Sequence, residues 1–288
     1  MQRRIFIQSL AIGAATFAAG DVFAEAKKAR NYGVQLYTVR QPIAKDLEKT
    51  LTQLKSMGYD KVELFGYDGK FFGKTAQEFR QILNNTGLKA VSSHHMSGLG
   101  MKAKGSISEG WDQAIEDMHT VGAEYMVCAF LFPNERNAEN YNKLPDMFNK
   151  AGEKTKAAKI QFAYHNHDFE FEKFGDSTLM DYIITKTSPE LVKVELDLYW
   201  ISKTGNDPVA YFNKYPGRFP LWHVKDMEKG TNGITEVGNG VIDFDRIFAA
   251  RKKAGLKHWF VEQDVSKGDI FESLKTSHSY LDGKKYKV

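Results

Sequence analysis

The feature that most constrains the fold is a regular alternation of short apolar runs, rich in β-branched and aromatic residues, with longer amphipathic stretches. Runs of the first kind predict β-strands, and stretches of the second kind predict helices. The strand candidates lie at residues 32–39, 60–67, 88–95, 125–132, 160–167, 192–200, 219–226 and 258–264. The chain therefore predicts an α/β protein with eight strands.

The stretches between the strands carry helix-ending signals. They include residues 46–58, 75–87, 108–122, 143–159 and 243–255, and four of them end in glycine, the residue that favours the left-handed turn after a helix. Eight such units in 288 residues predict a single-domain (β/α)8 TIM barrel. An open, doubly wound sheet is the alternative, but residues 37–46, after the first strand, contain no glycine for a phosphate-binding loop.

The N-terminal residues predict export. Residues 1–24 combine a basic start, an apolar segment and small residues before Ala24, as a secretory signal peptide does. The pair Arg3 and Arg4 resembles the twin-arginine signal, which exports folded proteins, and a general secretory signal is the alternative. We therefore expect a periplasmic protein whose barrel spans residues 25–288. No later segment has the ~20 continuous apolar residues that cross a bilayer, so no membrane partner is expected after cleavage.

The net charge and the cysteine content exclude some classes of partner and an internal disulfide. The net charge is +4, and loss of Arg3, Arg4 and Asp21 with the signal leaves +3, which is too balanced to indicate nucleic acid or an anionic membrane as a partner. Cys128 is the single cysteine, so an intramolecular disulfide is excluded. It lies inside the apolar run YMVCAFLF, and we expect it to be buried without a catalytic role.

Ionisable residues gather at the C-terminal ends of the predicted strands, where TIM barrels build their active sites. They are Glu63, His94, His95, His165, His167, Glu195, Asp197, His223, Lys225, Asp226, Glu262 and Asp264. A lone histidine at a strand end is usually structural, but burial of so many unpaired charges is costly, so their convergence indicates a site. Because His94 and His95 are adjacent in a strand, only one of them can face the barrel mouth.

Four of these residues are the best candidates for a metal site, one from each of the last four strands. They are His165, Asp197, His223 and Glu262. Two imidazoles and two carboxylates neutralise a divalent cation and leave positions open for water or substrate. Mn²⁺, Co²⁺, Zn²⁺ and Mg²⁺ are all compatible, whereas the nitrogen ligands argue against Ca²⁺.

Six stretches, in order along most of the chain, carry a resemblance to a known family. They are KVELFG (61–66), FAYHNHDFEF (162–171), VELDLYW (194–200), WHVKD (222–226), VGNGVIDF (237–244) and FVEQD (260–264). In these stretches the chain resembles the xylose isomerase-like TIM barrels. That family includes sugar and sugar phosphate isomerases and epimerases, inosose dehydratase and, more distantly, endonuclease IV of AP endonuclease family 2.

The resemblance implies a metal ion bound by Glu, Asp, His and Glu, with the two glutamates moving the proton. Asp197, His223 and Glu262 match that pattern, but His165 stands where the first glutamate is expected. The implied chemistry is proton abstraction next to a carbonyl, with the metal stabilising an enediolate. The resemblance also implies a possible homodimer.

Roles for the remaining residues follow from this chemistry. Glu262 is predicted to be one acid/base group, and the candidates for the second are His167, Glu195, Lys225 and Glu63, in that order. We expect Glu63, His94 and His95 to contact substrate. Aromatic residues that can stack on a sugar, or alternatively pack at the rim, are Tyr37, Phe65, Tyr67, Tyr199 and Trp222.

The leading functional prediction is a metal-dependent sugar isomerase or epimerase that works through an enediolate. The same intermediate can instead lose a β-oxygen substituent, so a lyase or hydratase of keto-sugars or 3-keto-glycosides is the alternative. A non-catalytic sugar-binding barrel is a third possibility, suggested by the missing glutamate. Cleavage of phosphodiesters ranks last. Export favours an unphosphorylated sugar or keto-sugar as the small-molecule partner.

Overall fold

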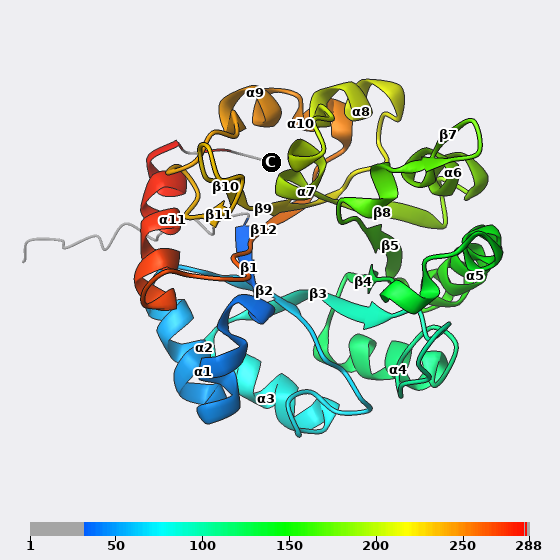
Figure 1. Cartoon of the computed structure of the whole chain (residues 1–288). Coiled ribbons are helices and arrows are strands. Elements are labelled where there is room, and N and C mark those ends of the chain that lie inside the picture. Colours follow the sequence, from blue (N-terminus) through cyan, green and yellow to red (C-terminus); the bar gives the residue numbers. More distant parts are fainter. Residues whose placement is uncertain (1–31, 285, 287–288) are drawn as a thin grey trace, which may run out of the picture.

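Eight parallel strands form a closed barrel in the order β1-β12-β9-β8-β5-β4-β3-β2. The computed structural model describes residues 32–284 and 286, so the predicted signal peptide lies outside the described residues. The helices form a ring around the strands (Figure 1). The predicted single-domain (β/α)8 TIM barrel is confirmed. None of the helices in the described part of the chain is long and apolar enough to cross a membrane.

The bounds of the elements follow the predicted alternation. The barrel strands are β1 (Tyr32–Gln35), β2 (Lys61–Leu64), β3 (Lys89–Met96), β4 (Tyr125–Phe130), β5 (Gln161–His165), β8 (Val192–Asp197), β9 (Leu221–Val224) and β12 (His258–Val261). The α-helices are α1 (Arg40–Lys45), α2 (Leu47–Ser56), α3 (Ala76–Thr86), α4 (Trp111–Val121), α5 (Ala138–Ala157), α6 (Leu179–Lys186), α7 (Leu198–Lys203), α8 (Pro208–Lys214), α9 (Phe244–Ala249), α10 (Arg251–Ala254) and α11 (Ile270–Lys284). Short 3-10 helices are η1 (Leu36–Val39), η2 (Pro133–Glu135) and η3 (Phe169–Phe171).

Seven of the eight barrel strands end two to four residues before the end predicted from the sequence, and in two of them, β1 and β8, a polar side chain caps the helix that follows. Asp197 ends β8, and its side chain accepts hydrogen bonds from the backbone N–H groups of Tyr199 and Trp200 at the start of α7. Gln35 ends β1 in the same way, with its side chain accepting from the backbone N–H of Tyr37 in η1. Both caps fix a polar side chain at the C-terminal end of the barrel.

Glycine marks the predicted helix ends. Gly87, Gly122 and Gly255 are the C-caps of α3, α4 and α10, with φ of 71°, 84° and 81°. Gly58, with φ of 101°, follows Met57, which caps α2.

Apolar side chains fill the space on both sides of the barrel wall. The larger cluster lies between the strands and the helices, and a smaller one, with Val91, Val127, Leu221 and Phe260 among its members, comes only from residues on the barrel strands. On β1, a Cβ atom added to Gly33 would lie 2.4 Å from the backbone oxygen of Lys61 on β2, so the two strands need a glycine here.

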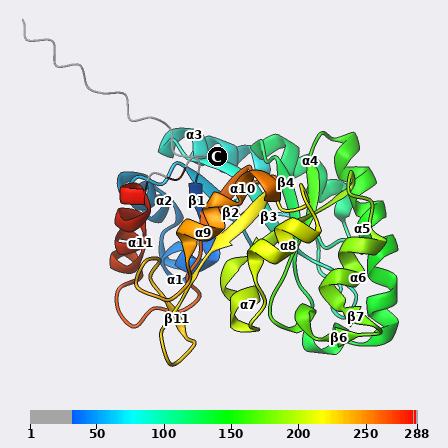
Figure 2. The same ribbon diagram turned by 90° about the horizontal axis from the view of Figure 1, so that it is seen from above.

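Two small sheets extend the barrel after β5 and β9. They are β6 (Lys173–Phe174) with β7 (Ser177–Thr178), and β10 (Asp226–Met227) with β11 (Ile234–Thr235). Figure 2 shows the labels of β6, β7 and β11 at the same lower edge of the barrel. These sheets enlarge one end of the barrel, the end at which β5 and β9 finish.

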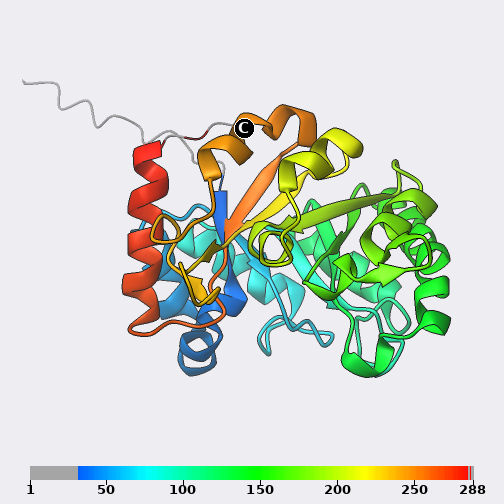
Figure 3. The ribbon, with the colours of Figure 1, turned by 45° about the horizontal axis from the view of Figure 1, so that its top comes forward.

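The segment after β9 is held in place by Asp226. Its carboxylate accepts hydrogen bonds from the backbone N–H groups of Met227, Gly238, Gly240 and Ile242. A Cβ atom at Gly240 would lie 2.2 Å from Asp226 Oδ1, which explains why the sequence VGNG follows WHVKD. The segment also packs beside α11 (Figure 3), where the backbone N–H of Val237 donates to Ser277.

Candidate active site at the mouth of the barrel

A cavity of about 540 Å³ opens among the residues that end or follow the barrel strands. Its buried or partly buried lining is ionisable: His94, His165, His167, Lys225, Glu262 and Asp264. The other lining residues are Gly66, the charged Arg40, and a set of aromatic or apolar residues: Tyr37, Phe65, Met96, Ala129, Phe130, Phe132 and Val265. The cavity therefore has a charged part and an apolar part.

The four predicted metal ligands come together beside this cavity. His165, Asp197, His223 and Glu262 each offer a ligand atom, all four atoms lie within 4.8 Å of one another, and all four residues are buried. His165 Nε2 lies 3.0 Å from His223 Nδ1, and His223 Nδ1 lies 2.9 Å from Glu262 Oε2. The set consists of two nitrogen and two oxygen donors that point at one place.

Both histidines are oriented by hydrogen bonds from their outer ring nitrogens. His165 Nδ1 lies 3.1 Å from the backbone oxygen of Ala129, and His223 Nε2 lies 2.6 Å from Glu63 Oε1. Because a carbonyl or carboxylate oxygen can only accept, these nitrogens carry the protons, which leaves the facing Nε2 of His165 as a lone-pair donor. Burial opposes protonation of His223, but Glu195, Glu262 and Glu63 raise its pKa well above its usual value, so its Nδ1 also carries a proton, which a bound metal ion would displace. An outer N–H bound to a carbonyl or carboxylate is the usual arrangement of metal-binding histidines.

Asp197 supplies an oxygen to the same place. Its Oδ1 caps α7, whereas its buried Oδ2 accepts no well-oriented hydrogen bond and lies 3.6 Å from His165 Nε2. The backbone N–H of Asp197 donates to the side chain of Asn166, which ties the end of β8 to the end of β5. Asp197 Oδ2 thus lies beside the facing nitrogens of both histidines, and this combination of imidazole and carboxylate donors fits a divalent cation.

Lys225 places a fixed positive charge beside the four ligands. Its Nζ lies 2.7 Å from Glu262 Oε2, 3.1 Å from Asp197 Oδ2 and 3.0 Å from Asp264 Oδ2. Burial opposes the charge, but the three carboxylates raise the pKa of Lys225 well above its usual value. The side chain is therefore an ammonium ion at neutral pH.

A second group of ionisable residues lies next to His223. His94 Nε2 lies 2.7 Å from Glu195 Oε2 and 3.1 Å from Glu63 Oε1, and Gln35 donates to the same Glu63 oxygen at 2.8 Å. Burial opposes ionisation of both partners, yet His94 and His223 lower the pKa of Glu63, and Glu63 helps to raise the pKa of His94 to about 10. Burial and Glu63 raise the pKa of Glu195 to about 7.

This second group also has ligand atoms within 4.8 Å of one another. However, Glu63 Oε1 already lies within hydrogen-bond distance of nitrogens of Gln35, His94 and His223. The group therefore orients His223 from behind, and the ligand set with His165 is the better metal site.

His167 is a free imidazole in the cavity wall. Its Nδ1 is buried and has no hydrogen-bond partner among the described residues, and its ring packs 4.8 Å from that of Phe130. Burial and the neighbouring His165 lower the pKa of His167 well below its usual value, so the ring is neutral at pH 7.

The other predicted site residues fall into two groups. Tyr37 and Phe65 line the cavity, with their ring centroids 5.4 Å apart. His95 faces the helices, where it packs against Trp111, while its neighbour His94 faces the mouth. Trp222 is fully buried between Phe212 and Phe248, and so it is not brought to the cavity.

The hydroxyl groups of Tyr67 and Tyr199 form hydrogen bonds away from the cavity. Tyr67 donates to Asp117 at 2.5 Å, and Tyr199 donates to the backbone oxygen of Asn232 at 2.8 Å. Neither residue lines the cavity.

Sequence reasoning did not assign a role to Gln35, Asn166 or Asp264. Gln35 is a fully buried polar residue inside the apolar run YGVQLYTV, which was a usable signal for a hydrogen bond at the strand end. Asn166 lies between the two histidines of YHNH, but its bond to the backbone of Asp197 depends on the pairing of β5 with β8. Asp264 appeared among the strand-end acids, and the structure adds its contact with Lys225.

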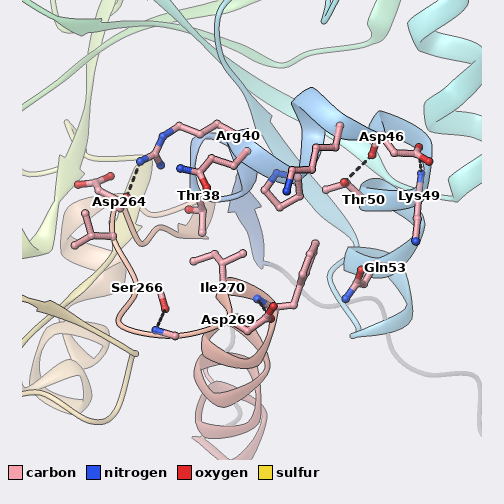
Figure 4. Close-up of a pocket in the computed structure, with 16 residues that line it drawn as sticks. Thr38, Arg40, Asp46, Lys49, Thr50, Gln53, Asp264, Ser266, Asp269 and Ile270 are labelled. Carbon is pink, nitrogen blue, oxygen red and sulfur yellow. Dashed lines mark hydrogen bonds between the residues drawn. The ribbon is translucent and has the colours of Figure 1, made fainter.

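A neighbouring cavity of about 630 Å³ lies between α1, α2 and the start of α11. Figure 4 shows that Arg40 reaches Asp264 at its edge, where the guanidinium donates to the backbone oxygen at 2.9 Å. Its walls include mostly exposed polar residues such as Lys45 and Lys49, and none of the predicted metal ligands.

A family model described as xylose isomerase-like TIM barrel matches residues 51–275. The chain belongs to the xylose isomerase-like TIM barrel family. Among curated relatives, an inosose dehydratase of Lacticaseibacillus casei is 24% identical over 263 residues, covering 77% of this chain and 87% of that protein. Inosose dehydratases of Bacillus cereus are similar at 23% identity.

Solved structures agree with this membership. A sugar phosphate isomerase/epimerase from Parabacteroides distasonis superposes with a TM-score of 0.80 at 28% identity, covering 94% of this chain and 99% of that one. The IolI protein, solved with a bound zinc atom, superposes with a TM-score of 0.71 at 16% identity, covering 90% and 99% of the two chains. Among these relatives of the xylose isomerase-like barrel, the inosose dehydratases and the isomerase/epimerase are sugar-modifying enzymes.

Proposed function

We propose that this protein is a metal-dependent lyase or hydratase of keto-sugars, which breaks or forms a carbon–oxygen bond β to a carbonyl group. Elimination or hydration was the alternative prediction from the sequence, and we now rank it above isomerisation or epimerisation. The curated relatives support it, since several are inosose dehydratases. The zinc-bound IolI structure supports the need for a divalent metal.

The observation that carries the proposal is the state of His165. Epimerisation needs two proton-transfer groups on opposite faces of one carbon, and the resemblance expects a glutamate here. Instead, one ring nitrogen of His165 lies 3.1 Å from Ala129 O and the other faces the ligand set. Neither nitrogen is free to accept a proton from substrate. Elimination needs different partners: a base for the α-proton and an acid for the departing oxygen.

His165, Asp197, His223 and Glu262 would hold the metal. A divalent ion bound there supplies a Lewis acid that polarises a carbonyl oxygen and stabilises negative charge on it. The next step depends on residues of this chain that face the same cavity.

His167 and Lys225 are the residues best placed for the two proton transfers. His167 lines the cavity as a neutral imidazole, and we assign it the α-proton. The Lys225 ammonium, held by Asp197, Glu262 and Asp264, is the donor to the departing oxygen. The α C–H and β C–O bonds break, a C=C bond forms, and the oxygen leaves as water or an alcohol.

A sugar isomerase or epimerase is the second candidate. The Parabacteroides distasonis isomerase/epimerase, at 28% identity, favours it. Glu262 is present, and Glu195 lies nearby as a second carboxyl whose pKa burial raises to about 7. Isomerisation would retain every substituent of the sugar.

The proposed roles are tested with the metal-loaded protein and a panel of keto-sugars, with release of water or alcohol as the readout. His167→Ala should keep its metal but lose at least about 100-fold in turnover, as expected for loss of an acid/base group. Trp200→Phe, at a ring beside His167, is the matched control and should stay within a few-fold of the wild type. Wild-type turnover by His167→Ala, or by the protein after its metal has been removed, would contradict the proposal.

We also propose that the protein acts after export, directed by residues 1–24. The basis is the sequence of that segment alone. Fusion of residues 1–24 to a reporter that functions only in the periplasm should give signal, and Arg3→Lys with Arg4→Lys should abolish it if the twin-arginine route is used. Cytoplasmic retention of the unmodified fusion would refute export.

A further inference from the structure

The apolar part of the cavity is an arc that runs over four neighbouring strands. Tyr37 follows β1, Phe65 follows β2, Met96 ends β3, and Phe130 and Phe132 lie at and after the end of β4. These strands are adjacent in the barrel order, so the five side chains line one side of the cavity, which we call the aromatic arc. The predicted metal ligands come from the other four strands, β5, β8, β9 and β12.

The arc leaves apolar surface open to solvent. Tyr37 is 40% exposed and Val265, which lines the same cavity, is 60% exposed. Among the described residues, only two further large hydrophobic side chains, Met101 and Val241, are exposed. Two of these four exposed hydrophobic residues thus line the same cavity. Apolar surface gathered in this way usually marks a binding site.

The rings of the arc are braced by one another. Tyr37 and Phe65 meet edge to face at 5.4 Å, and so do Phe130 and Phe132. The Arg40 guanidinium, which lines both this cavity and the neighbouring polar cavity, lies 4.2 Å from the centre of the Tyr37 ring. The arc is therefore a preformed surface, and a ring that packs on it gains apolar burial at little cost in side-chain entropy.

The charged part of the cavity and the aromatic arc are suited to two different parts of one ligand. A keto-sugar ring placed at the charged groups takes up that part of the cavity of about 540 Å³ and leaves the aromatic arc facing water. We propose that the arc binds a second ring of the substrate, so that the natural substrate is a keto-glycoside whose second unit presents an apolar face, either another pyranose or an aromatic aglycone. This inference rests on the proposed function, because it places the reacting ring at the metal ligands.

The chemistry of such a substrate matches the proposed elimination. In a 3-keto-glycoside, the hydrogen on C2 is α to the carbonyl and the glycosidic oxygen on C1 is β to it. Loss of the C2 proton and cleavage of the C1–O bond form a C1=C2 double bond. The departing oxygen gains a proton, and the second ring leaves as a neutral alcohol or phenol. The keto group is already present in the substrate, so no oxidant is needed.

Binding of unreactive glycosides separates this inference from the proposed reaction. Titration calorimetry of the metal-loaded protein compares methyl β-glucoside, phenyl β-glucoside and cellobiose, none of which carries a keto group. At least one two-ring ligand should bind about tenfold more tightly than the methyl glycoside, the difference expected from one well-packed ring. The stronger of the two ligands identifies the second unit.

Variants locate the binding surface. Tyr37→Ala and Phe132→Ala should each reduce the preference for the two-ring ligand severalfold, whereas binding of the methyl glycoside should change little. Val241→Ala, at an exposed apolar residue outside the cavity, and Gln53→Ala, in the neighbouring polar cavity, are the controls. Equal affinity for all three ligands, no measurable binding of any of them, or loss of preference only in Gln53→Ala would overturn the inference.

The reaction itself is followed separately with 3-keto-nitrophenyl glucoside. Tight two-ring binding without nitrophenol release would leave the arc assigned and would refute the proposed elimination. Nitrophenol release with no two-ring preference would support the elimination and refute the arc as a subsite.

Discussion

His165 and His223 face each other with Nε2 of the first 3.0 Å from Nδ1 of the second, while their outer nitrogens lie against oxygens of Ala129 and Glu63. Two ring nitrogens at this distance need a proton or a cation between them, and the raised pKa of His223 supplies the proton while no metal is bound. Asp197 Oδ2 and Glu262 Oε2 complete the ring of donors around the same place. This relationship links the sequence motif YHNH to the proposed metal chemistry.

Metal content depends on these two histidines. His165→Ala and His223→Ala should each lose most of the divalent metal that the wild type retains after desalting, because each removes one of four ligand atoms. Elemental analysis of the folded proteins measures this. His119→Ala, at an exposed position in α4, should keep the wild-type amount. Full metal content in both ligand variants would show that the ion binds elsewhere.

Lys225 balances the charge of the ligand carboxylates. Lys225→Met leaves Asp197, Glu262 and Asp264 without their ammonium partner, so the metal-free variant should lose about 3–5 kcal/mol of unfolding free energy. Bound metal should restore much of this loss, since the cation replaces the missing charge. Turnover should stay at least about 100-fold below wild type even with metal, because the proton donor is gone.

Urea unfolding with and without metal measures the effect of Lys225→Met. Lys203→Met removes an exposed lysine 3.1 Å from Asp168 and should cost less than about 1 kcal/mol in either condition. If Lys225→Met were as stable as Lys203→Met without metal, Lys225 would not be the counter-charge.

His95 makes the fold sensitive to acid. Burial lowers its pKa to about 4, so the folded state resists protonation between pH 6.5 and 4 while the unfolded state takes up a proton. The unfolded state then binds more protons, and stability falls as the pH drops through this window. Between pH 7 and 5 the expected loss from this residue is about 2 kcal/mol.

The matched variant is His95→Asn, whose amide can still donate to the backbone oxygen of Gly105. Its unfolding free energy should depend less on pH than that of the wild type between pH 7 and 5. An identical pH dependence in both proteins would show that His95 is not the responsible group.

Closure of the barrel depends on Gly33. A methyl group there meets the backbone of Lys61, so Gly33→Ala should destabilise the protein by about 1–3 kcal/mol or more. Gly268→Ala, where an added Cβ meets nothing within 4 Å, should change the unfolding free energy by no more than about 0.5 kcal/mol. Equal stabilities of the two variants in thermal unfolding would contradict the close approach of β1 and β2.

Most of the barrel was predictable because its signals are local. Each predicted strand contains one barrel strand to within a residue, from YGVQ at β1 to HWFV at β12, and three of the predicted glycines cap their helices. The strand ends were less predictable. The run LYW after Asp197 is as apolar as a strand, but the carboxylate of Asp197 begins α7 there.

The site was predictable where position along a strand decides the direction of a side chain. Alternation placed one of His94 and His95 at the mouth, and the same rule put His165 and His167 on one side. Contacts between distant strands were not predictable. The bond of Gln35 to Glu63, for example, depends on the register of β1 with β2. Trp222 is different, because alternation with His223 already places it toward the helices, so its predicted contact with substrate did not follow from the rule.

The most direct test of elimination over epimerisation is mass spectrometry of the products formed from a 3-keto-glucoside in D₂O by the metal-loaded protein. The account predicts release of the C1 substituent, a sugar product that carries a new double bond or the water added to it, and no starting compound with deuterium at C2 in an inverted configuration. Deuterium at C2 with the C1 substituent retained would contradict the account and establish an epimerase.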